Sequence, residues 1–597
     1  MIPAFTDQTG SLPTEASKLV RGMTWLRGRI ASHSRKILLG VIAALLFCLV
    51  IPPVVMVLFS SIRSTENRLP FEATRFTLAN LIKVFTSDAT CRLFVNTAWY
   101  AIGSLFFAMA LAVTFAWFLE RTHLPFRRLL FVLVLAPMGM PMIITGMAWV
   151  LLANPANGLF NVMLRTSLGF HGPGPLNIYS IPGMIGVTGL SIVPMIYIMI
   201  SGVFSRLDPS VEEAGRTSGA GPWITFSRIS MPLLAPALLA ATIYFLLRTI
   251  EGFEIPAMLG MPKRIFVFSS GIYYSVNPVT GFPDYGVAST YGLVLLVIAG
   301  VLIFLYGRYI RHAERFATVT GRGYRPRLID LGPWKYLPVV AISGYFVVAV
   351  GMPLLILVWT SLAPRFVAIS PSALSQLNLN AYRKLLDYPA LWVAAKNTAI
   401  IAVATAAIGV LLVTLVSWFS VRGGIRGARL PDRLTFVTLG VPDVVLGLAL
   451  IFIYASLPIP LYGSLWIIVL GLVTTSLPFG TRLMTAAFLQ IHRELEEAAA
   501  TSGAGLRSTF FRIVLPLLWP SFARGFLWMF VRSLRETTLA LMLYAAGNQT
   551  LAVTLWYLWV EDANFPLASA IAVPLMIVTT ALTFLVAKQT MLMKEVG

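Results

Sequence analysis

Charged residues and cysteines are scarce in this chain, and their scarcity excludes several classes of protein. Only 12% of its 597 residues are charged and 57% are hydrophobic, whereas soluble globular proteins carry about 25% charged residues. Two cysteines, Cys48 and Cys91, cannot build a disulfide framework or a cysteine-rich metal site. The five histidines show no zinc-ligand spacing. No Gly-Lys dipeptide occurs, which excludes a nucleotide-binding P-loop of the GxxxxGK[ST] kind.

Long apolar runs dominate instead. Residues 37–60 contain no charge over 24 positions, which is enough to cross a bilayer core of about 30 Å as a helix. This run is also too long for the core of a signal peptide, so we expect a permanent span. Because backbone polar groups must be satisfied inside lipid, such runs predict helices. We therefore expect an all-α integral membrane protein with about 12 transmembrane helices. The predicted spans lie near residues 37–60, 93–119, 129–153, 181–204, 233–260, 287–308, 337–361, 391–420, 434–456, 464–488, 517–545 and 566–587.

The net charge of +21 reflects short basic loops between spans rather than a nucleic-acid surface. Arginines gather after the second span, after the sixth and after the eighth, while the alternate loops carry few basic residues near the spans. The positive-inside rule then predicts that these loops and both termini face the cytoplasm. We expect the lipid bilayer as a partner and no nucleic acid.

One phrase occurs twice, at Glu212–Pro236 (the first loop) and Glu496–Pro520 (the second loop), and the two copies align without a gap. Earlier in each half, Asn96 matches Asn397 and Pro141 matches Pro442. The two residues of each of these pairs lie farther apart in the sequence than corresponding residues of the two loops do. An insertion of about 17 residues is therefore expected in the first half, between these matches and the first loop. An even number of spans separates the copies, which predicts two parallel six-helix repeats.

These observations predict four parts. They are a cytoplasmic N-terminal tail (1–36), a first six-span half (37–308), a basic cytoplasmic linker (309–336) and a second six-span half (337–597).

The repeated phrase is typical of a short helix, a break and a second helix. Acidic residues near its start suit a helix N-terminus, and Gly219 and Gly221 favour a helix end. Pro232 follows where the next helix enters the membrane. Such a short helix with small residues can dock into a groove on a cytoplasmic partner. It can also cap its own bundle, although two matching copies in diverged halves favour docking.

The second loop resembles the EAA signature of ABC-importer permeases at Glu497-Ala498-Ala499, Gly503, Ile513, Leu515 and Pro516. The first loop departs from this signature at Gly215 and Met231. In that family the loop is the coupling helix, which inserts into the ATPase subunit. The resemblance implies the type I importer permease fold and these coupling residues: Glu212, Glu213, Ala214, Gly219, Pro232, Glu496, Glu497, Ala498, Gly503 and Pro516.

The resemblance covers nearly the whole chain apart from its N-terminal tail and is strongest for the fused, ferric-iron type of permease. It implies a chain in the bacterial cytoplasmic membrane that is not an enzyme and binds no cofactor itself. Two copies of a cytoplasmic ABC ATPase would bind ATP and Mg. An extracytoplasmic binding protein would deliver the substrate, docking on the loops 62–92 and 361–396. Thiamine, aminoethylphosphonate and polyamine permeases are close relatives, so these substrates stay open.

Charges inside the predicted spans are costly and are candidates for the pathway. They can also be internal ion pairs that neutralise one another. Glu254, Glu536 and Asp443 offer the hard oxygen ligands that Fe³⁺ prefers, although no ligand set converges in the sequence. The candidate pathway residues are Arg248, Glu251, Glu254, Asp443, Arg532, Arg535 and Glu536.

Two other classes are weighed against an importer permease. An ion-coupled secondary transporter also uses parallel six-span repeats, but it has no need of a duplicated EAA loop. A membrane-embedded enzyme requires a catalytic constellation, and the sequence offers no such set.

Overall fold

The computed structural model describes residues 14–64, 69–73, 75–169, 172–204, 214–215, 217–313, 328–367, 369, 371–424 and 426–596. Within these ranges the chain is almost entirely helical, and β pairing is limited to two isolated bridges. Among the described residues, ten helices are long and apolar enough to cross a membrane, or up to twelve if two bent pairs each count as one span. The prediction of an all-α protein with about twelve spans is thereby confirmed.

The first half contains α1 (Thr14–Ser61), α2 (Ala79–Thr86), α3 (Asp88–Arg121), α4 (Arg127–Leu135), η1 (Ala136–Gly139), α5 (Met142–Ala153), α6 (Leu159–Leu168), α7 (Ile181–Phe204), α9 (Pro222–Thr225), η2 (Phe226–Ser230), α10 (Met231–Glu251), η3 (Pro256–Gly260), η4 (Met261–Lys263), α11 (Phe268–Val276) and α12 (Tyr285–Ala313). The second half contains η6 (Gly332–Lys335), α13 (Tyr336–Phe346), η7 (Val347–Gly351), α14 (Met352–Leu362), α15 (Pro371–Leu374), α16 (Asn380–Leu386), α17 (Pro389–Arg422), α18 (Leu430–Val437), η8 (Thr438–Gly440), α19 (Asp443–Ser456), α20 (Leu465–Leu489), α21 (Glu494–Thr501), α22 (Leu506–Thr509), η9 (Phe510–Val514), α23 (Leu515–Leu534), α24 (Thr538–Met542), α25 (Leu551–Val560) and α26 (Phe565–Val596).

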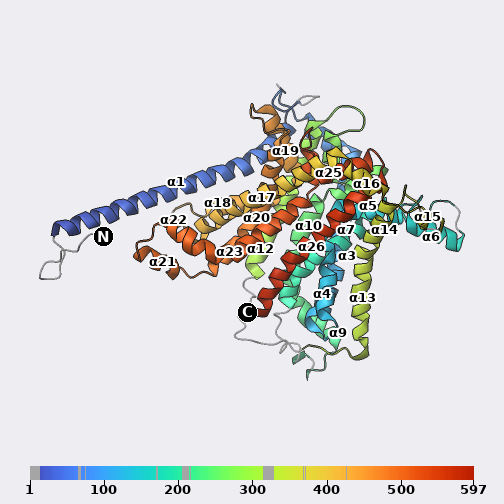
Figure 1. The fold of residues 1–597 in the computed structure, drawn as a ribbon, viewed down its shortest axis with the longest axis horizontal. Coiled ribbons are helices and arrows are strands. Elements are labelled where there is room, and N and C mark those ends of the chain that lie inside the picture. The colour runs from blue at the N-terminus through green and yellow to red at the C-terminus, as the bar shows by residue number, and fades with distance from the viewer. Residues whose placement is uncertain are drawn as a thin grey trace. The chain divides into compact units, whose positions relative to one another are not determined.

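The chain forms two compact units that do not follow the two sequence halves. The smaller unit consists of Met1–Pro52, Ala407–Thr438 and Ser476–Phe526, and so contains the second loop. The larger unit consists of Pro53–Ala406, Leu439–Thr475 and Leu527–Gly597, and contains the first loop. In the larger unit α3 and α7 run side by side (Figure 1). The four-part division of the chain stays a sequence-based proposal.

The third span bends sharply in the middle. Its two parts, Arg127–Gly139 and Met142–Ala153, meet at 96° around Pro141. Proline lacks a backbone N–H and disfavours a helical conformation in the residue before it, so it ends one helix and can start the next. The ninth span is interrupted in the same way before Pro442, which is the proline that the sequence comparison paired with Pro141.

Equivalent glycines bring the two halves together within the larger unit. A Cβ atom on Gly139 would lie 2.5 Å from the Cα atom of Thr580 in α26, in the other half. Its counterpart in the second half, Gly440, similarly faces Ile303 of α12, where a Cβ atom would lie 2.7 Å from Cδ1. The repeat predicted from the sequence is therefore also seen in the packing, because a glycine of each half lies in close contact with the last span of the other half.

Replacing Gly139 with alanine is expected to lower the free energy of unfolding by about 1–3 kcal/mol, because the new methyl group meets a neighbouring backbone. Gly440→Ala is the matched control. Its methyl group meets only the end of the Ile303 side chain, which can rotate away, so a loss below about 1 kcal/mol is expected. Thermal unfolding of the two detergent-solubilised variants measures the difference, and equal losses would contradict the close approach at Thr580.

The fifth and eleventh spans begin and end earlier than the apolar runs predict. Helical structure begins at Pro222 and Leu506, and it stops at Glu251 and Leu534 rather than at residues 260 and 545. Beyond these points only the short segments η3 and α24 continue. Charged side chains interrupt both apolar runs at the break, and non-helical backbone at membrane depth is tolerated only where protein or a water-filled cavity surrounds it. Both spans are thus broken where the candidate pathway charges lie.

The insertion expected between residues 154 and 179 contains a helix of its own, α6. Asn161, which is fully buried, holds this segment closed by donating to the carbonyl of Leu176 at 2.7 Å and accepting from its N–H at 3.0 Å. The corresponding stretch of the second half, residues 457–464, is fully described and forms only bends and turns.

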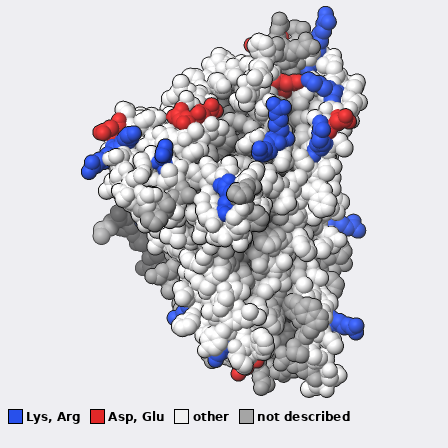
Figure 2. All heavy atoms as spheres, turned by 90° about the vertical axis from the view of Figure 1, so that its right-hand side faces the viewer, with Lys and Arg blue, Asp and Glu red and all other residues white. Residues whose placement is uncertain are grey.

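Charged side chains avoid the middle of the visible surface. On the face drawn in Figure 2, most Lys, Arg, Asp and Glu side chains gather toward the upper and lower ends of the view, and the surface between is largely uncharged. An uncharged belt of this kind suits the lipid that the sequence predicts around the spans.

Candidate functional site

The two loops fold identically where the structure describes both. In the first, the N–H of Ser218 donates to the carbonyl of Ala214 at 3.1 Å, and the N–H of Ala220 donates to that of Gly215 at 3.0 Å. In the second, Ser502 donates to Ala498 at 3.0 Å and Ala504 to Ala499 at 3.0 Å. The second bond of each set, from Ala220 or Ala504 to the residue five positions earlier, is the six-to-one bond of a Schellman helix end. Two copies that lie in different surroundings thus keep one backbone geometry.

Glycine is required at the end of both short helices. Gly219 has a φ of +85° and Gly503 a φ of +80°, in the left-handed region that other residues enter only at a cost. Both residues are exposed, and a Cβ atom on either would meet nothing within 4 Å. A substitution there would bend the backbone and also add a side chain, so its two effects could not be separated.

A π-helical turn precedes the proline of each loop. η2 (Phe226–Ser230) comes before Pro232, and η9 (Phe510–Val514) comes before Pro516. A proline inside an α-helix clashes with the carbonyl four residues earlier, and a π-bulge is one of the ways a helix accommodates such a fault. The repeated Pro232 and Pro516 therefore mark where the loop turns into the span.

The remaining predicted coupling residues divide by exposure. Ala214, Ala498 and Glu497 are exposed, and the Glu497 side chain is 64% accessible. Glu212 and Glu213 lie outside the described residues. The signature usually has alanine where the first loop has Gly215. Gly215 lies against Ile229, because a Cβ atom on Gly215 would come within 2.4 Å of the Cδ1 atom of Ile229.

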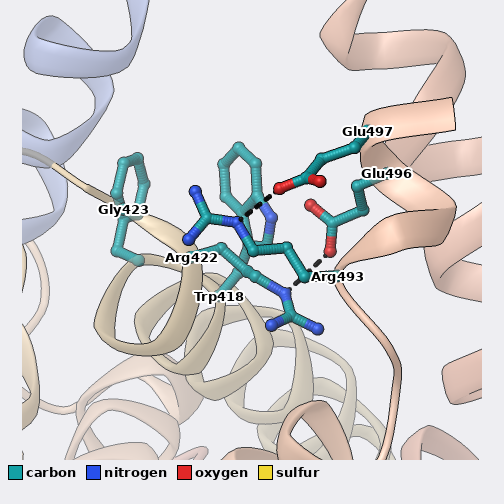
Figure 3. A pocket seen from close by; sticks show the side chains of 7 residues that line it. Trp418, Arg422, Gly423, Arg493, Glu496 and Glu497 are labelled. Atoms are coloured by element: carbon teal, nitrogen blue, oxygen red, sulfur yellow. Dashed lines mark hydrogen bonds and ion pairs between the residues drawn. The ribbon is translucent and has the colours of Figure 1, made fainter. Parts of the chain in front are cut away.

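Glu496 behaves differently from its neighbour Glu497. Its side chain is 19% accessible and pairs with Arg422 at 2.9 Å. A cavity of about 160 Å³ lies at this point between the end of α17 and α21, and Figure 3 shows the carboxylates of Glu496 and Glu497 turned toward Arg422 and Arg493. Sequence reasoning used Arg422 only as a loop charge for topology. The repeat pairs Arg422 with Arg121, which ends the equivalent helix of the first half, and this match was a signal that could have identified it.

The intramembrane charges gather in the larger unit as two ion pairs. Arg248 contacts Glu251 at 2.8 Å along α10. Arg532 contacts Asp443 of α19 at 3.5 Å, and it donates to the hydroxyl of Thr475 at 2.8 Å. The structure therefore brings Asp443, alone in its span by sequence, to an arginine of the eleventh span.

The two halves neutralise equivalent arginines by different means. Arg248 and Arg532 match in the repeat, but the position of Glu251 is taken by Arg535 in the second half. There the acid comes from another helix, as Asp443, while Arg535 donates to the carbonyl of Met140 at 3.0 Å. A bond from the eleventh span to the bend of the third span thus joins the halves.

The remaining acids complete one electrostatic cluster. Coulomb interactions join Asp443 to Arg248, Glu251, Glu254 and Glu536. Glu251 is 6% exposed, and its Oε1 atom has no hydrogen-bond partner. Four carboxylates face three arginines here, so the cluster carries one formal negative charge in excess. Among the described residues no three Asp, Glu, His or Cys side chains form a metal-ligand group, so the cluster is no closed metal site.

Two repeats of apolar helices, each with an exposed loop of one geometry and a broken span that carries charge, define a polytopic membrane transport protein. Comparison with known families identifies the kind of transport protein. The chain belongs to the family of binding-protein-dependent transport system inner membrane components, whose model matches residues 108–315 and 415–590. It is thus a permease of the ABC importer type with the type I fold, and members of this class are transporters rather than enzymes.

Two similar proteins cover most of its length. The ferric transport system permease protein FbpB of Actinobacillus pleuropneumoniae is 26% identical over 572 residues, 95% of this chain and 78% of that protein. The Fe(3+)-transport system permease protein FbpB 2 of Haemophilus influenzae is 22% identical over 527 residues, 87% of this chain and 95% of that protein.

Proposed function

We propose that this permease moves ferric iron across the bacterial cytoplasmic membrane. Two copies of a separate cytoplasmic ATPase, which bind ATP and Mg, dock on the first and second loops and drive the transport. An extracytoplasmic binding protein delivers the iron to the opposite face, where α2, α15 and α16 lie in the long loops. Both termini lie in the cytoplasm.

The shared geometry of the two loops is the observation that carries the proposal. A loop that only capped its own bundle would be free to diverge along with the helices beneath it. Instead the helix end, the left-handed glycine, the π-helical turn and the proline recur at matching positions in both halves. Binding of both loops to the same kind of partner explains why all four features are kept.

The broken spans support a pathway through the charge cluster. Discontinuous helices whose ends meet near the membrane midplane form substrate sites in many transporters. α10 and α23 stop beside Glu251 and Arg535, and Arg535 bonds to the bend of the third span. Closure of the ATPase dimer would move the two half-bundles and so open or close this bond.

Ferric iron is favoured as substrate by two observations. Two relatives that cover most of the chain are named for ferric transport. The charge cluster also contains Asp443 and Glu536, and carboxylate oxygens are hard ligands of the kind that Fe³⁺ prefers. Thiamine, aminoethylphosphonate and polyamine remain the substrates to test against it.

Proteoliposomes that contain this chain, its cognate ATPase and its binding protein are expected to accumulate ⁵⁵Fe(III) against a gradient only when ATP is supplied. Omitting the ATPase should remove uphill uptake completely, because this chain has no P-loop of its own. Excess unlabelled thiamine, aminoethylphosphonate or spermidine should leave iron uptake unchanged.

Different results would contradict the ATPase and the substrate in this proposal. Uphill uptake without the ATPase would indicate an ion-coupled secondary transporter. ATP-dependent uptake of one of the three competitors, with no uptake of iron, would overturn the substrate and keep the ATPase.

A further inference from the structure

We infer that Arg422 is a positioning residue that ties the second loop to α17 through Glu496. This inference rests on the proposed docking of an ATPase at that loop. The two adjacent acids of the phrase then have separate roles. Glu496 holds the loop to its own span, and Glu497 is available to the partner.

Arg422 is built into the bundle rather than the solvent. It is the last residue of α17, a helix of 34 residues, and its side chain is only 11% accessible. Its Nε atom donates to Glu496 at 2.9 Å, and its Nη2 atom donates to the carbonyls of Phe488 and Ile491. These carbonyls lie at and just beyond the end of α20. One guanidinium therefore joins α17, α20 and α21, using its fork of donors as a lysine could not.

The exposure of α21 shows what holds it. Glu494, Leu495, Glu497 and Ala498 are exposed, whereas Glu496 and Ala499, three residues apart and so on one helical face, turn inward. Ala499 offers only a methyl group for packing. The charged hydrogen bond of Glu496 is the more directional contact on this face, because it joins two ionised groups with little exposure.

Because a cavity lies beside them, the ion pair of Arg422 and Glu496 is more important for holding α21 against α17. The cavity is lined by Trp418, Phe419, Arg422, Gly423, Arg493, Glu496 and Glu497, so part of the space between α17 and α21 is not filled by side chains (Figure 3). The second ion pair at its edge, Arg493 with Glu497 at 3.3 Å, joins two positions at the start of α21 and is exposed at both ends, with accessibilities of 68% and 64%. It therefore does not tie the helix to the bundle.

The first half repeats the arrangement in sequence. Arg121 is the last residue of α3, also 34 residues long, and is 2% exposed. The repeat pairs Arg121 with Arg422, and it pairs Glu212 with Glu496. Glu212 lies outside the described residues, so the inference is drawn for Arg422 and Glu496 alone.

A tie of this kind converts motion of the loop into motion of the span. When an ATPase moves α21, the bond to Arg422 passes the displacement to the end of α17 instead of letting the loop flex alone. Breaking it should therefore uncouple ATP hydrolysis from transport while leaving the exposed docking face in place.

The test is a charge reversal of the pair in the complex of this permease with its cognate ATPase and binding protein. Arg422→Glu and Glu496→Arg are each expected to reduce substrate transported per ATP at least tenfold, while ATPase binding changes less than about threefold. The double variant Arg422→Glu with Glu496→Arg should recover most of the coupling. Arg493→Glu with Glu497→Arg, in the exposed pair, is the matched control. Its change in docking should appear in ATPase affinity rather than in the coupling ratio.

Milder substitutions test the same inference if a charge reversal prevents the chain from inserting into the membrane. Glu496→Gln preserves size and Arg422→Lys preserves charge, and both are expected to lower the coupling ratio, because the first removes the negative charge from the bond and the second removes the fork of donors. Normal coupling in these variants, or a double reversal no better than either single one in a folded complex, would overturn the inference. If the unaltered chain does not bind the ATPase at all, the proposed function fails instead, which keeps the two failures distinct.

Discussion

A permease that carries Ala214→Trp and Ala498→Trp together is expected to bind its ATPase at least about 100-fold more weakly and to lose uphill transport. Both alanines are exposed and lie in the short helix that ends at Gly219 or Gly503. An indole at the centre of a docked helix would displace it from its groove, and residues at such centres dominate binding energy. A 100-fold loss corresponds to about 2.7 kcal/mol. Titration of labelled ATPase against the detergent-solubilised permease measures it.

Alanine is the better site for this experiment than glycine, because these positions are helical and the substitution does not strain the backbone. Ala79→Trp is the control: Ala79 is also an exposed alanine in a short helix, α2, on the side predicted to face away from the ATPase. Each single variant should bind with intermediate strength, since one loop remains intact. Unchanged ATPase affinity in the double variant would contradict docking at these loops.

Arg532→Met is expected to destabilise the bundle by about 3–5 kcal/mol, the usual loss when one partner of a buried ion pair is removed. Arg532 and Asp443 are each 17% accessible and lie at predicted membrane depth, so Asp443 would be left there without its ion-pair partner. Thermal unfolding in detergent gives the size of the loss. The double variant Arg532→Met with Asp443→Leu should recover most of the stability, because it removes both charges.

An exposed ion pair provides the control for that experiment. Lys83 and Asp284 are 2.6 Å apart, but their side chains are 65% and 39% accessible, and surface pairs contribute about 0–1 kcal/mol. Lys83→Met should therefore change stability little. A double variant at Arg532 and Asp443 that is no more stable than the single one would show that their proximity does not matter to the fold.

Much of the fold could be predicted because lipid imposes simple rules. Each apolar run had to be a helix, but the interruptions of the third and ninth spans were not predicted, although Pro141 and Pro442 gave a signal for them. The ends of the fifth and eleventh spans were wrong, since hydropathy cannot tell a continuous helix from a broken one when apolar residues flank the break. The π-helical turns were missed for a similar reason, although a proline just beyond each turn gave a signal.

The sequence by itself determined that this chain spans a membrane in two parallel halves and presents one phrase twice. Hydrophobic length, charge placement and repetition are properties of residues along the chain, and each carries its meaning without knowledge of contacts. Only the tertiary structure decided which charges meet: Asp443 with Arg532, Arg535 with the carbonyl of Met140, and Arg422 with Glu496. The Coulomb energy of a pair and its penalty for leaving water depend on distance and burial, and packing alone sets both when the partners lie far apart along the chain.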